Sequence, residues 1–301
     1  MWVIKGNIRL WMNTEQKIEN EEGLRYLKEI DSNSIDLILT DPPYITSQDS
    51  GMDRWVKLVE RQNTPGAVPM KTEAQWVSYR DKKDWDRFFG NSEISDRPKA
   101  MSKMRHDYLK YGSIYGTKYA VQTDFGDWDA DFTIDMLSEF VHEFYRVLRK
   151  GGTAIIFFDL WKISDLKTIY ESAKFKQLRF IEWIKTNPQP RNSNVNYLTN
   201  AREIAITAVK GGKPTFNSKY DNGIYEYPVY SGKDRFHPTQ KSLLLFEDLI
   251  KKHSSEGEVV LDPFLGSGTT ALASRNTGRN FLGCEVDENF YKKTIDRMKN
   301  F

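Results

Sequence analysis

Two short apolar runs in this chain each end in an Asp-Pro loop. The first run, IDLILT at residues 35–40, leads into DPPY at residues 41–44, and the second, VVL at residues 259–261, leads into DPFLGSGTT at residues 262–270. Short runs rich in β-branched residues are typical of strands buried on both faces of a parallel sheet. Because open α/β sheets bind ligands at the carboxyl ends of their strands, both loops are predicted to bind ligands.

Strand and helix patterns alternate over much of the chain, which predicts an α/β fold with a mostly parallel sheet and helices on both faces. Apolar residues follow helical spacing over residues 134–148, and Gly151-Gly152 are expected to end that helix. Residues 180–185 and 203–209 resemble two strands without a helix between them, so we expect an antiparallel hairpin at the edge of a mixed sheet. The other expected elements are helices at residues 24–30, 166–173, 243–250, 269–276 and 289–299 and strands at residues 154–158 and 281–286.

Residues 45–125 lose this periodicity and are polar, with scattered proline and glycine. So long a segment between clear elements is typical of a lid, a binding insertion or a partly disordered region. Within it, residues 97–119 hold six Lys or Arg against one acid, with four tyrosines interleaved. Such a segment can follow phosphates and stack on bases, or it can be a solvated surface loop. The net charge of the chain is only +2, so overall charge does not indicate a nucleic-acid partner.

The second loop has the features of a nucleoside site. Gly266 and Gly268 remove side chains where backbone must approach a ligand, and they permit positive φ. The loop precedes a predicted helix, whose amino terminus favours anionic groups. Glu285 ends the next strand, where a carboxylate can accept hydrogen bonds from both ribose hydroxyls. A tight turn without a ligand is the alternative, while the patterns of a P-loop and of a hydrolase elbow are absent from this loop.

The first loop suits an aromatic amine, whose nitrogen is a poor nucleophile because its lone pair is delocalised into the ring. The Asp41 carboxylate can accept one amine hydrogen and the Pro42 carbonyl the other, which aims the lone pair at an electrophilic methyl group. Pro42 and Pro43 stiffen the loop by fixing φ, and Tyr44 offers a face on which an extruded base can stack. A proline-rich turn with an incidental aspartate is the alternative.

Other residues argue against several further classes of site. Cys284 is the only cysteine and lies in a predicted strand, so it is expected to be a buried core residue with no internal disulfide partner. The four histidines show no metal-ligand spacing, so no metal is expected. The chain shows neither a signal peptide nor an apolar run of membrane-spanning length, which predicts a cytoplasmic protein with no membrane partner.

Together with five further motifs, the two loops resemble a known family. The motifs are FGDWD at residues 125–129, LRKGG at 148–152, WIKTNP at 183–188, NARE at 200–203 and HPTQK at 237–241. Their order, with DPPY before the glycine loop, resembles the S-adenosylmethionine-dependent DNA amino-methyltransferases of the permuted β class. The resemblance covers residues 24–44 and 126–301 and implies a Rossmann-like methyltransferase fold in circularly permuted motif order. The catalytic domain would then comprise residues 1–44 and 126–301, with residues 45–125 as an insertion.

The resemblance implies roles for individual residues. The catalytic loop that holds the target base would be Asp41, Pro42, Pro43 and Tyr44. The cofactor pocket would be formed by Phe264, Gly266, Ser267, Gly268 and Thr269, with Asp262 orienting the loop and Glu285 binding the ribose. His237, Thr239 and Lys241 would lie at the methionine end, where Thr239 or Lys241 reaches the carboxylate. Asn20, Glu21 and Glu22 are alternatives for the residue that contacts the cofactor adenine.

The implied activity is site-specific methylation of DNA at N6 of adenine after base flipping. In this family DPPY goes mostly with adenine and SPPY-type loops with cytosine, so cytosine N4-methylation is the first alternative. A non-catalytic DNA-binding module that kept the fold is the second. The expected partners are DNA, a second copy in a homodimer and a cognate restriction endonuclease of a bacterial or phage system.

Two segments are alternatives for reading the DNA target. Residues 210–236, where this class usually carries target recognition, are short and look irregular. Residues 45–125 are unusually long, so recognition is expected to be shared with, or moved to, this DNA-contacting or lid insertion. The candidate DNA-binding residues in it are Arg97, Lys99, Lys103 and Arg105.

Overall fold

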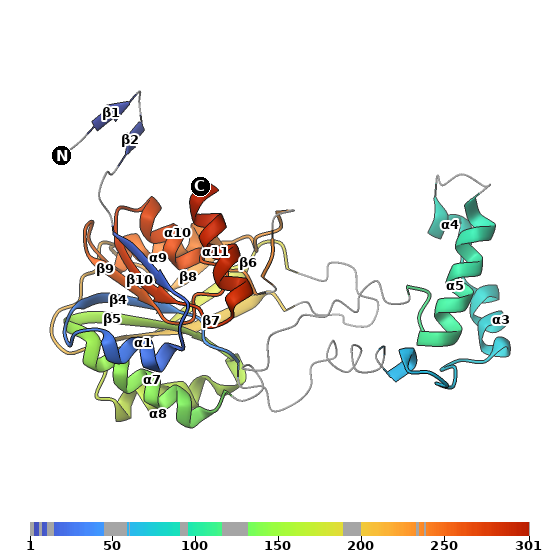
Figure 1. Cartoon of the computed structure of the whole chain (residues 1–301), viewed down its shortest axis with the longest axis horizontal. Helices are drawn as coiled ribbons and strands as arrows, with labels where there is room; N and C mark the ends of the chain where they lie inside the picture. Colours follow the sequence, from blue (N-terminus) through green and yellow to red (C-terminus); the bar gives the residue numbers. More distant parts are fainter. Residues whose placement is uncertain are drawn as a thin grey trace. The chain divides into compact units, whose positions relative to one another are not determined.

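The computed structural model divides the chain into two compact units (Figure 1). Met1–Ile45 and Gly126–Phe301 form the first, here called the sheet unit, and Thr46–Phe125 form the second, the helical unit. The structure describes residues 3–5, 8–10, 15–44, 59, 61–90, 96–115, 132–188, 200–232, 235–237 and 239–300. The FGDWD motif and Pro238 therefore lie outside the described residues.

A mixed eight-stranded sheet forms the centre of the sheet unit, in the order β3-β10-β9-β4-β5-β7-β6-β8. Its strands are β3 (Gln16–Glu19), β4 (Ile35–Thr40), β5 (Leu148–Phe158), β6 (Lys176–Lys185), β7 (Arg202–Val209), β8 (Ile224–Tyr227), β9 (Val259–Asp262) and β10 (Asn280–Cys284). β7 pairs antiparallel with both β5 and β6, and every other pairing in this sheet is parallel. The described strands β1 (Val3–Lys5) and β2 (Ile8–Leu10) form a separate antiparallel pair. The predicted α/β class with an antiparallel pair is confirmed.

The strands that precede the two Asp-Pro loops are neighbours in this sheet. β4 and β9 run parallel, with Leu37 opposite Val260 and Ile38 opposite Leu261. Parallel strands end at the same edge, so DPPY and the glycine loop both leave the sheet at its carboxyl edge, side by side. Hydrogen bonding between β4 and β9 thus joins two motifs from opposite ends of the chain.

Helices cover the sheet on both faces, as Figure 1 shows. α1 (Gly23–Glu29), α7 (Ile134–Val147) and α8 (Ile163–Ser172) pack against one face through a core that includes Leu27, Phe144 and Tyr170. α9 (Leu243–His253), α10 (Thr269–Asn276) and α11 (Glu288–Asn300) cover the other, where Phe246 stacks on Phe157. Alternate residues of β4 face the two cores, which explains why the strand is apolar along almost its whole length. A 3-10 turn, η2 (Leu160–Lys162), links β5 to α8.

Three segments differ from the sequence-based expectation. Gly151-Gly152 do not end α7, because the helix already ends at Val147, and Leu148 pairs with Ile35 as the first residue of β5. The expected hairpin is present, but β8 pairs parallel with β6 and takes the edge of the sheet. β8 was expected to be irregular, and β3 was not expected at all. Each has four residues, too few to show a strand period in the sequence.

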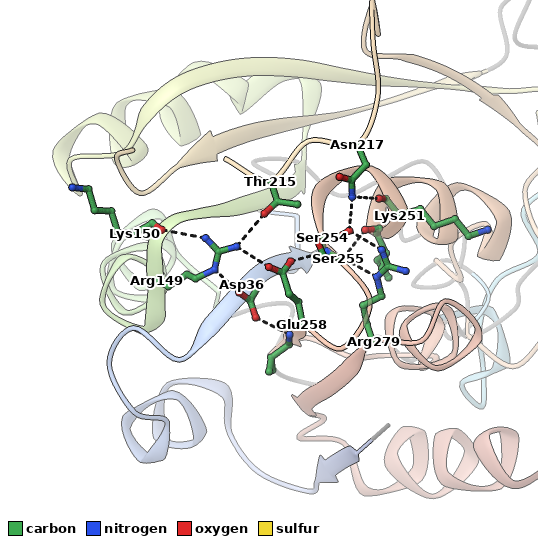
Figure 2. A network of polar contacts seen from close by, with 12 residues as sticks. Asp36, Arg149, Lys150, Thr215, Asn217, Lys251, Ser254, Ser255, Glu258 and Arg279 are labelled. Atoms are coloured by element: carbon green, nitrogen blue, oxygen red, sulfur yellow. Dashed lines mark hydrogen bonds and ion pairs between the residues drawn. The ribbon is translucent and has the colours of Figure 1, made fainter. Parts of the chain in front are cut away.

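A polar network ties strands together at the amino edge of the sheet, opposite the two loops (Figure 2). The Arg149 guanidinium donates to the Asp36 carboxylate of β4 and, at 3.0 and 3.1 Å, to Glu258 and Thr215. The other oxygen of Asp36 accepts from the Val259 amide at 2.8 Å. Arg149 therefore links β4, β5, the start of β9 and the segment after β7, and the arginine of LRKGG has a structural role.

The same network continues through the end of α9 (Figure 2). Arg279 donates to the Ser254 carbonyl at 2.6 Å and to its hydroxyl at 3.1 Å. Asn217 donates to the carbonyls of Ser254 and Lys251 at 2.8 and 3.0 Å. These bonds satisfy carbonyls that the last turn of α9 leaves unpaired, and they anchor the segment after β7.

The described part of the helical unit includes the helices α3 (Glu73–Lys82), α4 (Trp85–Phe89) and α5 (Arg97–Tyr111). They pack through aromatic rings, with Trp76 buried and Tyr79 stacked on Tyr108 at 4.8 Å between ring centroids. The Lys83 ammonium lies 4.0 Å from the centroid of the Phe88 ring. No regular apolar stripe is needed for such packing, which explains why no helical period is visible in the sequence of this unit.

Candidate active site

The Asp262 carboxylate joins the two loops at the carboxyl edge of the sheet. One oxygen accepts from the Thr40 hydroxyl at 2.6 Å and from the Phe264 amide at 3.1 Å, and the other accepts from the Thr270 hydroxyl at 2.6 Å. Burial raises the pKa of Asp262 to about 6, although these donors oppose the rise. Thr40 directly precedes Asp41, so Asp262 holds DPPY against the start of α10. This geometry agrees with a loop-orienting residue.

Backbone geometry explains the glycines of the second loop. Gly266 and Gly268 have φ of +52° and +76°, in the left-handed region that side chains disfavour. A Cβ on Gly268 would lie 2.5 Å from Cγ2 of Thr294 in α11, so the loop also needs the space. The Gly266 amide donates to Oε2 of Glu285 at 2.7 Å, and the Asp287 amide donates to Oε1 at 2.9 Å. Glu285 thus fixes the loop and is buried, and that burial raises its pKa.

Three further residues of the expected pocket, Phe264, Ser267 and Thr269, pack against neighbouring parts of the sheet unit. The Phe264 ring packs against Phe140 of α7, with centroids 4.4 Å apart. The hydroxyls of Ser267 and Thr269 are buried and lie 3.0 Å from each other. Asn20, one alternative for the adenine contact, donates to the Glu285 carbonyl at 2.7 Å, which places the end of β3 beside this pocket.

His237 of the HPTQK segment lies against the glycine loop. A Cβ on Gly266 would lie 3.3 Å from Nε2 of His237, whose ring also packs on Phe290 at 4.5 Å between centroids. The Thr239 amide donates to Nδ1 of His237 at 3.3 Å. Burial lowers the pKa of His237 to about 4, with help from the positive charges of Lys241 and Arg235. His237 is therefore neutral near pH 7 and can accept this hydrogen bond.

Lys241 lies on the DPPY side of the site. Its ammonium is 2.7 Å from Oδ2 of Asp41 and 2.6 Å from Oε2 of Glu203. Glu203 in turn pairs with the Lys185 ammonium at 2.7 Å. The sequence expectation had Lys241 or Thr239 reaching a cofactor carboxylate, whereas the structure engages Lys241 with two protein carboxylates. Sequence reasoning assigned no role to Glu203 or Lys185, although NARE and WIKTNP contain them.

Two polar atoms of DPPY are buried without a hydrogen bond to any described residue, namely Oδ1 of Asp41 and the hydroxyl of Tyr44. The Tyr44 ring packs edge-on against Phe158, with centroids 6.2 Å apart. Because a buried polar group without a partner is unfavourable, these atoms are poised for a hydrogen-bonding ligand. The pKa of Asp41 is raised to about 6 by burial, which Lys241 opposes and Glu203 reinforces.

The candidate DNA-binding residues divide into two kinds. Arg97 pairs with Asp86 at 2.7 Å, and Arg105 holds Glu73 through two bonds of 2.8 and 2.6 Å, so both cations are engaged within the helical unit. Lys99 and Lys103 are exposed one turn apart on α5. Tyr108, one of the tyrosines interleaved with these cations, packs against Trp76 and Tyr79.

Within the described parts of the chain, no cluster of three or more His, Cys, Asp or Glu could hold a metal ion. Cys284 is buried and donates weakly to the Pro263 carbonyl at 3.5 Å, and burial raises the pKa of its thiol. Among the helices that the structure describes, none combines the length and apolar character needed to cross a membrane.

Comparison with known proteins gives both sequence and structural relatives. The model of the DNA methylase family of N6 and N4 methyltransferases matches residues 35–296. The Type II methyltransferase M2.DpnII of Streptococcus pneumoniae is 30% identical over 236 residues, which are 68% of this chain and 88% of that protein. The Type II methyltransferase M.HinfI of Haemophilus influenzae is 25% identical over 322 residues, covering 99% of this chain and 71% of that protein.

Solved structures show the same fold. The complex of M1.HpyAVI with S-adenosylmethionine has a TM-score of 0.54 at 23% identity and covers 93% of this chain and 98% of that chain. The cytosine-N4-specific PvuII DNA methyltransferase has a TM-score of 0.59 at 13% identity and covers 95% and 90%. The family match spans most of the chain and includes both Asp-Pro loops. This protein therefore belongs to the DNA methylase family of S-adenosylmethionine-dependent N6 and N4 amino-methyltransferases.

Proposed function

We propose that this protein methylates N6 of adenine in DNA after the base has been extruded from the helix. The observation that carries the proposal is Oδ1 of Asp41, a buried acceptor in DPPY without a hydrogen bond to any described residue, beside a glycine loop. An exocyclic amine carries two hydrogens and needs acceptors of this kind. An amine inside a duplex cannot reach a buried loop, so base flipping is part of the proposal.

The residues of the glycine loop fit S-adenosylmethionine, which supplies an electrophilic methyl group when bound. Gly266 and Gly268 keep this loop free of side chains, since a Cβ on Gly268 would collide with Thr294 and one on Gly266 would crowd His237. Each oxygen of Glu285 already accepts one backbone amide and keeps a further lone pair for a ribose hydroxyl. The proposed roles of Phe264, Ser267, Thr269 and Thr239 are to shape this pocket.

The protein's contribution to the transfer is positioning and charge. Oδ1 of Asp41 and the Pro42 carbonyl would accept the two amine hydrogens, and the Tyr44 ring would stack on the base. This arrangement localises the nitrogen lone pair and aims it along one direction. Asp41 is the stronger acceptor when it is ionised, and its pKa of about 6 leaves it mostly ionised at neutral pH.

Adenine is favoured over cytosine because the loop carries Asp41, the residue that goes mostly with adenine in this family. The fold similarity to a cytosine-N4-specific enzyme does not bear on the base, since at 13% identity it reflects architecture alone. The Type II names of the sequence relatives support a further proposal, a restriction endonuclease that recognises the same DNA site.

Expression in a host that lacks DNA methylation tests this function. Genomic DNA is digested to nucleosides, and mass spectrometry separates N6-methyladenine from N4-methylcytosine. The proposal expects N6-methyladenine, concentrated at one short sequence when the same DNA is sequenced with modification detection. Detection of N4-methylcytosine would agree with the family but contradict adenine as the target base. Unmodified DNA from a host that produces the folded protein would contradict methyltransferase activity.

A further inference from the structure

Four motifs that lie far apart in the sequence contribute one alternating row of charges. The row runs from Asp41 of DPPY to Lys241 of HPTQK, then to Glu203 of NARE and Lys185 of WIKTNP, with successive distances of 2.7, 2.6 and 2.7 Å. All four side chains are largely buried, with exposed fractions between 8 and 17%. Two positive and two negative charges balance, which is the condition under which such groups tolerate burial.

We propose that Lys241 is a positioning residue for methyl transfer, because its ammonium, clamped by Glu203, holds the Asp41 carboxylate with Oδ1 turned toward the substrate amine. This inference rests on the proposed function and extends it to the residues behind the catalytic loop. Lys241 itself does not touch the reacting atoms.

The contacts of Lys241 show how the carboxylate is oriented. Lys241 binds Oδ2 of Asp41, whereas Oδ1 has no hydrogen bond to a described residue. The second bond, to Glu203, prevents the flexible lysine chain from moving away. The Tyr44 and Phe157 rings lie 5.6 and 5.7 Å from the ammonium and limit its access to water. One oxygen of Asp41 is thus committed to Lys241 and the other is left for a ligand.

Charge gives Lys241 a second effect on Asp41. An ionised carboxylate is a stronger acceptor for an amine hydrogen than a protonated carboxyl group, and burial raises the pKa of Asp41. Lys241 opposes this rise, and Glu203 adds to it. Lys185 acts from one position further, by partly neutralising Glu203. Lys241 therefore keeps Asp41 ionised near neutral pH.

The competing explanation is that Lys241 binds the carboxylate of the cofactor. In the structure its ammonium already contacts two carboxylates, which satisfies its charge without a third. The two explanations differ in what a neutral replacement changes. Loss of a positioning residue lowers the rate of transfer, whereas loss of a cofactor ligand lowers cofactor affinity.

The test compares Lys241→Met, Lys241→Arg and Glu203→Gln with the wild type. The measurements are kcat, the pH profile of kcat/KM for DNA methylation, and the Kd of S-adenosylmethionine by calorimetry. For Lys241→Met we expect kcat to fall on the order of a hundredfold, while cofactor Kd changes less than about threefold. The acidic limb of the profile should move to higher pH, because Asp41 loses the charge that lowers its pKa.

Glu203→Gln should move the same limb to lower pH, because it removes a charge that raises the pKa of Asp41, while kcat falls as Lys241 loses its anchor. Lys241→Arg keeps the charge and should leave the limb at its wild-type position. If Lys241 and Glu203 had only a structural role, their replacement would not move the acidic limb in opposite directions. The pKa of Asp262 is also about 6, and its main causes do not include Lys241. If Asp262 determined the acidic limb, the limb would therefore stay in place in Lys241→Met.

The inference is overturned if Lys241→Met keeps the wild-type profile, or if it weakens cofactor binding tenfold or more while kcat is retained. Melting curves check that each variant folds, and if Lys241→Met does not, the limb shifts of Glu203→Gln and Lys241→Arg decide. Failure of the proposed function would be seen separately, as a wild-type protein that produces no N6-methyladenine.

Discussion

At the scale of single residues, Asp262 and Gly268 make the contacts that hold the two loops in place. Asp262 accepts from both Thr40 and Thr270 and so bridges the end of β4 and the start of α10. Gly268 combines a left-handed backbone with close contact to Thr294. The sequence identified both residues, since aspartate and glycine at strand ends are recognisable. Their hydroxyl and methyl partners became evident only in three dimensions.

Gly268→Ala should destabilise the fold more than a glycine change elsewhere with the same backbone. Gly257 is the matched control, because its φ is +82° and a Cβ there would meet no atom within 4 Å. Gly257→Ala should lower the free energy of unfolding by about 1 to 2 kcal/mol, the strain of a left-handed alanine. Gly268→Ala should lose a further 1 to 3 kcal/mol, roughly, from overpacking against Thr294. Urea denaturation measures both, and equal losses would contradict the close contact.

At the scale of elements, the central strands and the larger helices could be predicted because burial imposes a clear apolar pattern on them. β4, with its continuous apolar run, and α7, with apolar residues at helical spacing, are examples. β3 and β8 were missed because they are short edges, and α3 and α5 because aromatic contacts between helices replace an apolar stripe. The prediction that Gly151-Gly152 end the helix was wrong, because α7 ends at Val147 and β5 begins at Leu148, which pairs with Ile35 of β4.

Arg149 should stabilise the sheet without taking part in catalysis, because its contacts lie at the edge opposite the two loops. Arg149→Met should lower the free energy of unfolding by about 1 to 3 kcal/mol, since partly buried Asp36 and Glu258 lose a charged partner. Lys150→Met, at the exposed neighbour, should change it by less than about 0.5 kcal/mol. Denaturation gives the stabilities, and kcat well below the melting temperature should match the wild type for both variants.

At the scale of the whole molecule, the motifs DPPY, HPTQK, NARE and WIKTNP are joined by one row of ion pairs. The sequence showed their order, but it could not show that Asp41, Lys241, Glu203 and Lys185 touch, because the contacts join β4, β6, β7 and the segment before α9. Pairing of strands distant in sequence creates them. The helical unit adds a surface whose exposed Lys99 and Lys103 are the proposed DNA contacts, while Arg97 and Arg105 form ion pairs with Asp86 and Glu73 of the same unit.

Lys99→Gln combined with Lys103→Gln should weaken DNA binding and reduce its dependence on salt. Each phosphate contact that is lost should lower the slope of log K against log salt concentration by about one. Lys150→Gln combined with Lys251→Gln is the matched control, with the same charge change at the amino edge of the sheet. Fluorescence anisotropy at several salt concentrations measures both, and equal slopes for the two double variants would argue against the α5 surface.

The central claim is that DPPY holds the target amine beside the cofactor of the glycine loop. Its most direct test is transfer of a labelled methyl group from S-adenosylmethionine to DNA by the wild type and by Asp41→Ala. After digestion, the label should appear in N6-methyladenine for the wild type and be absent for the variant. The variant should still bind the cofactor with close to wild-type affinity, because Asp41 lies in the other loop. Continued methylation by Asp41→Ala, or transfer lost only because the cofactor no longer binds, would contradict the account.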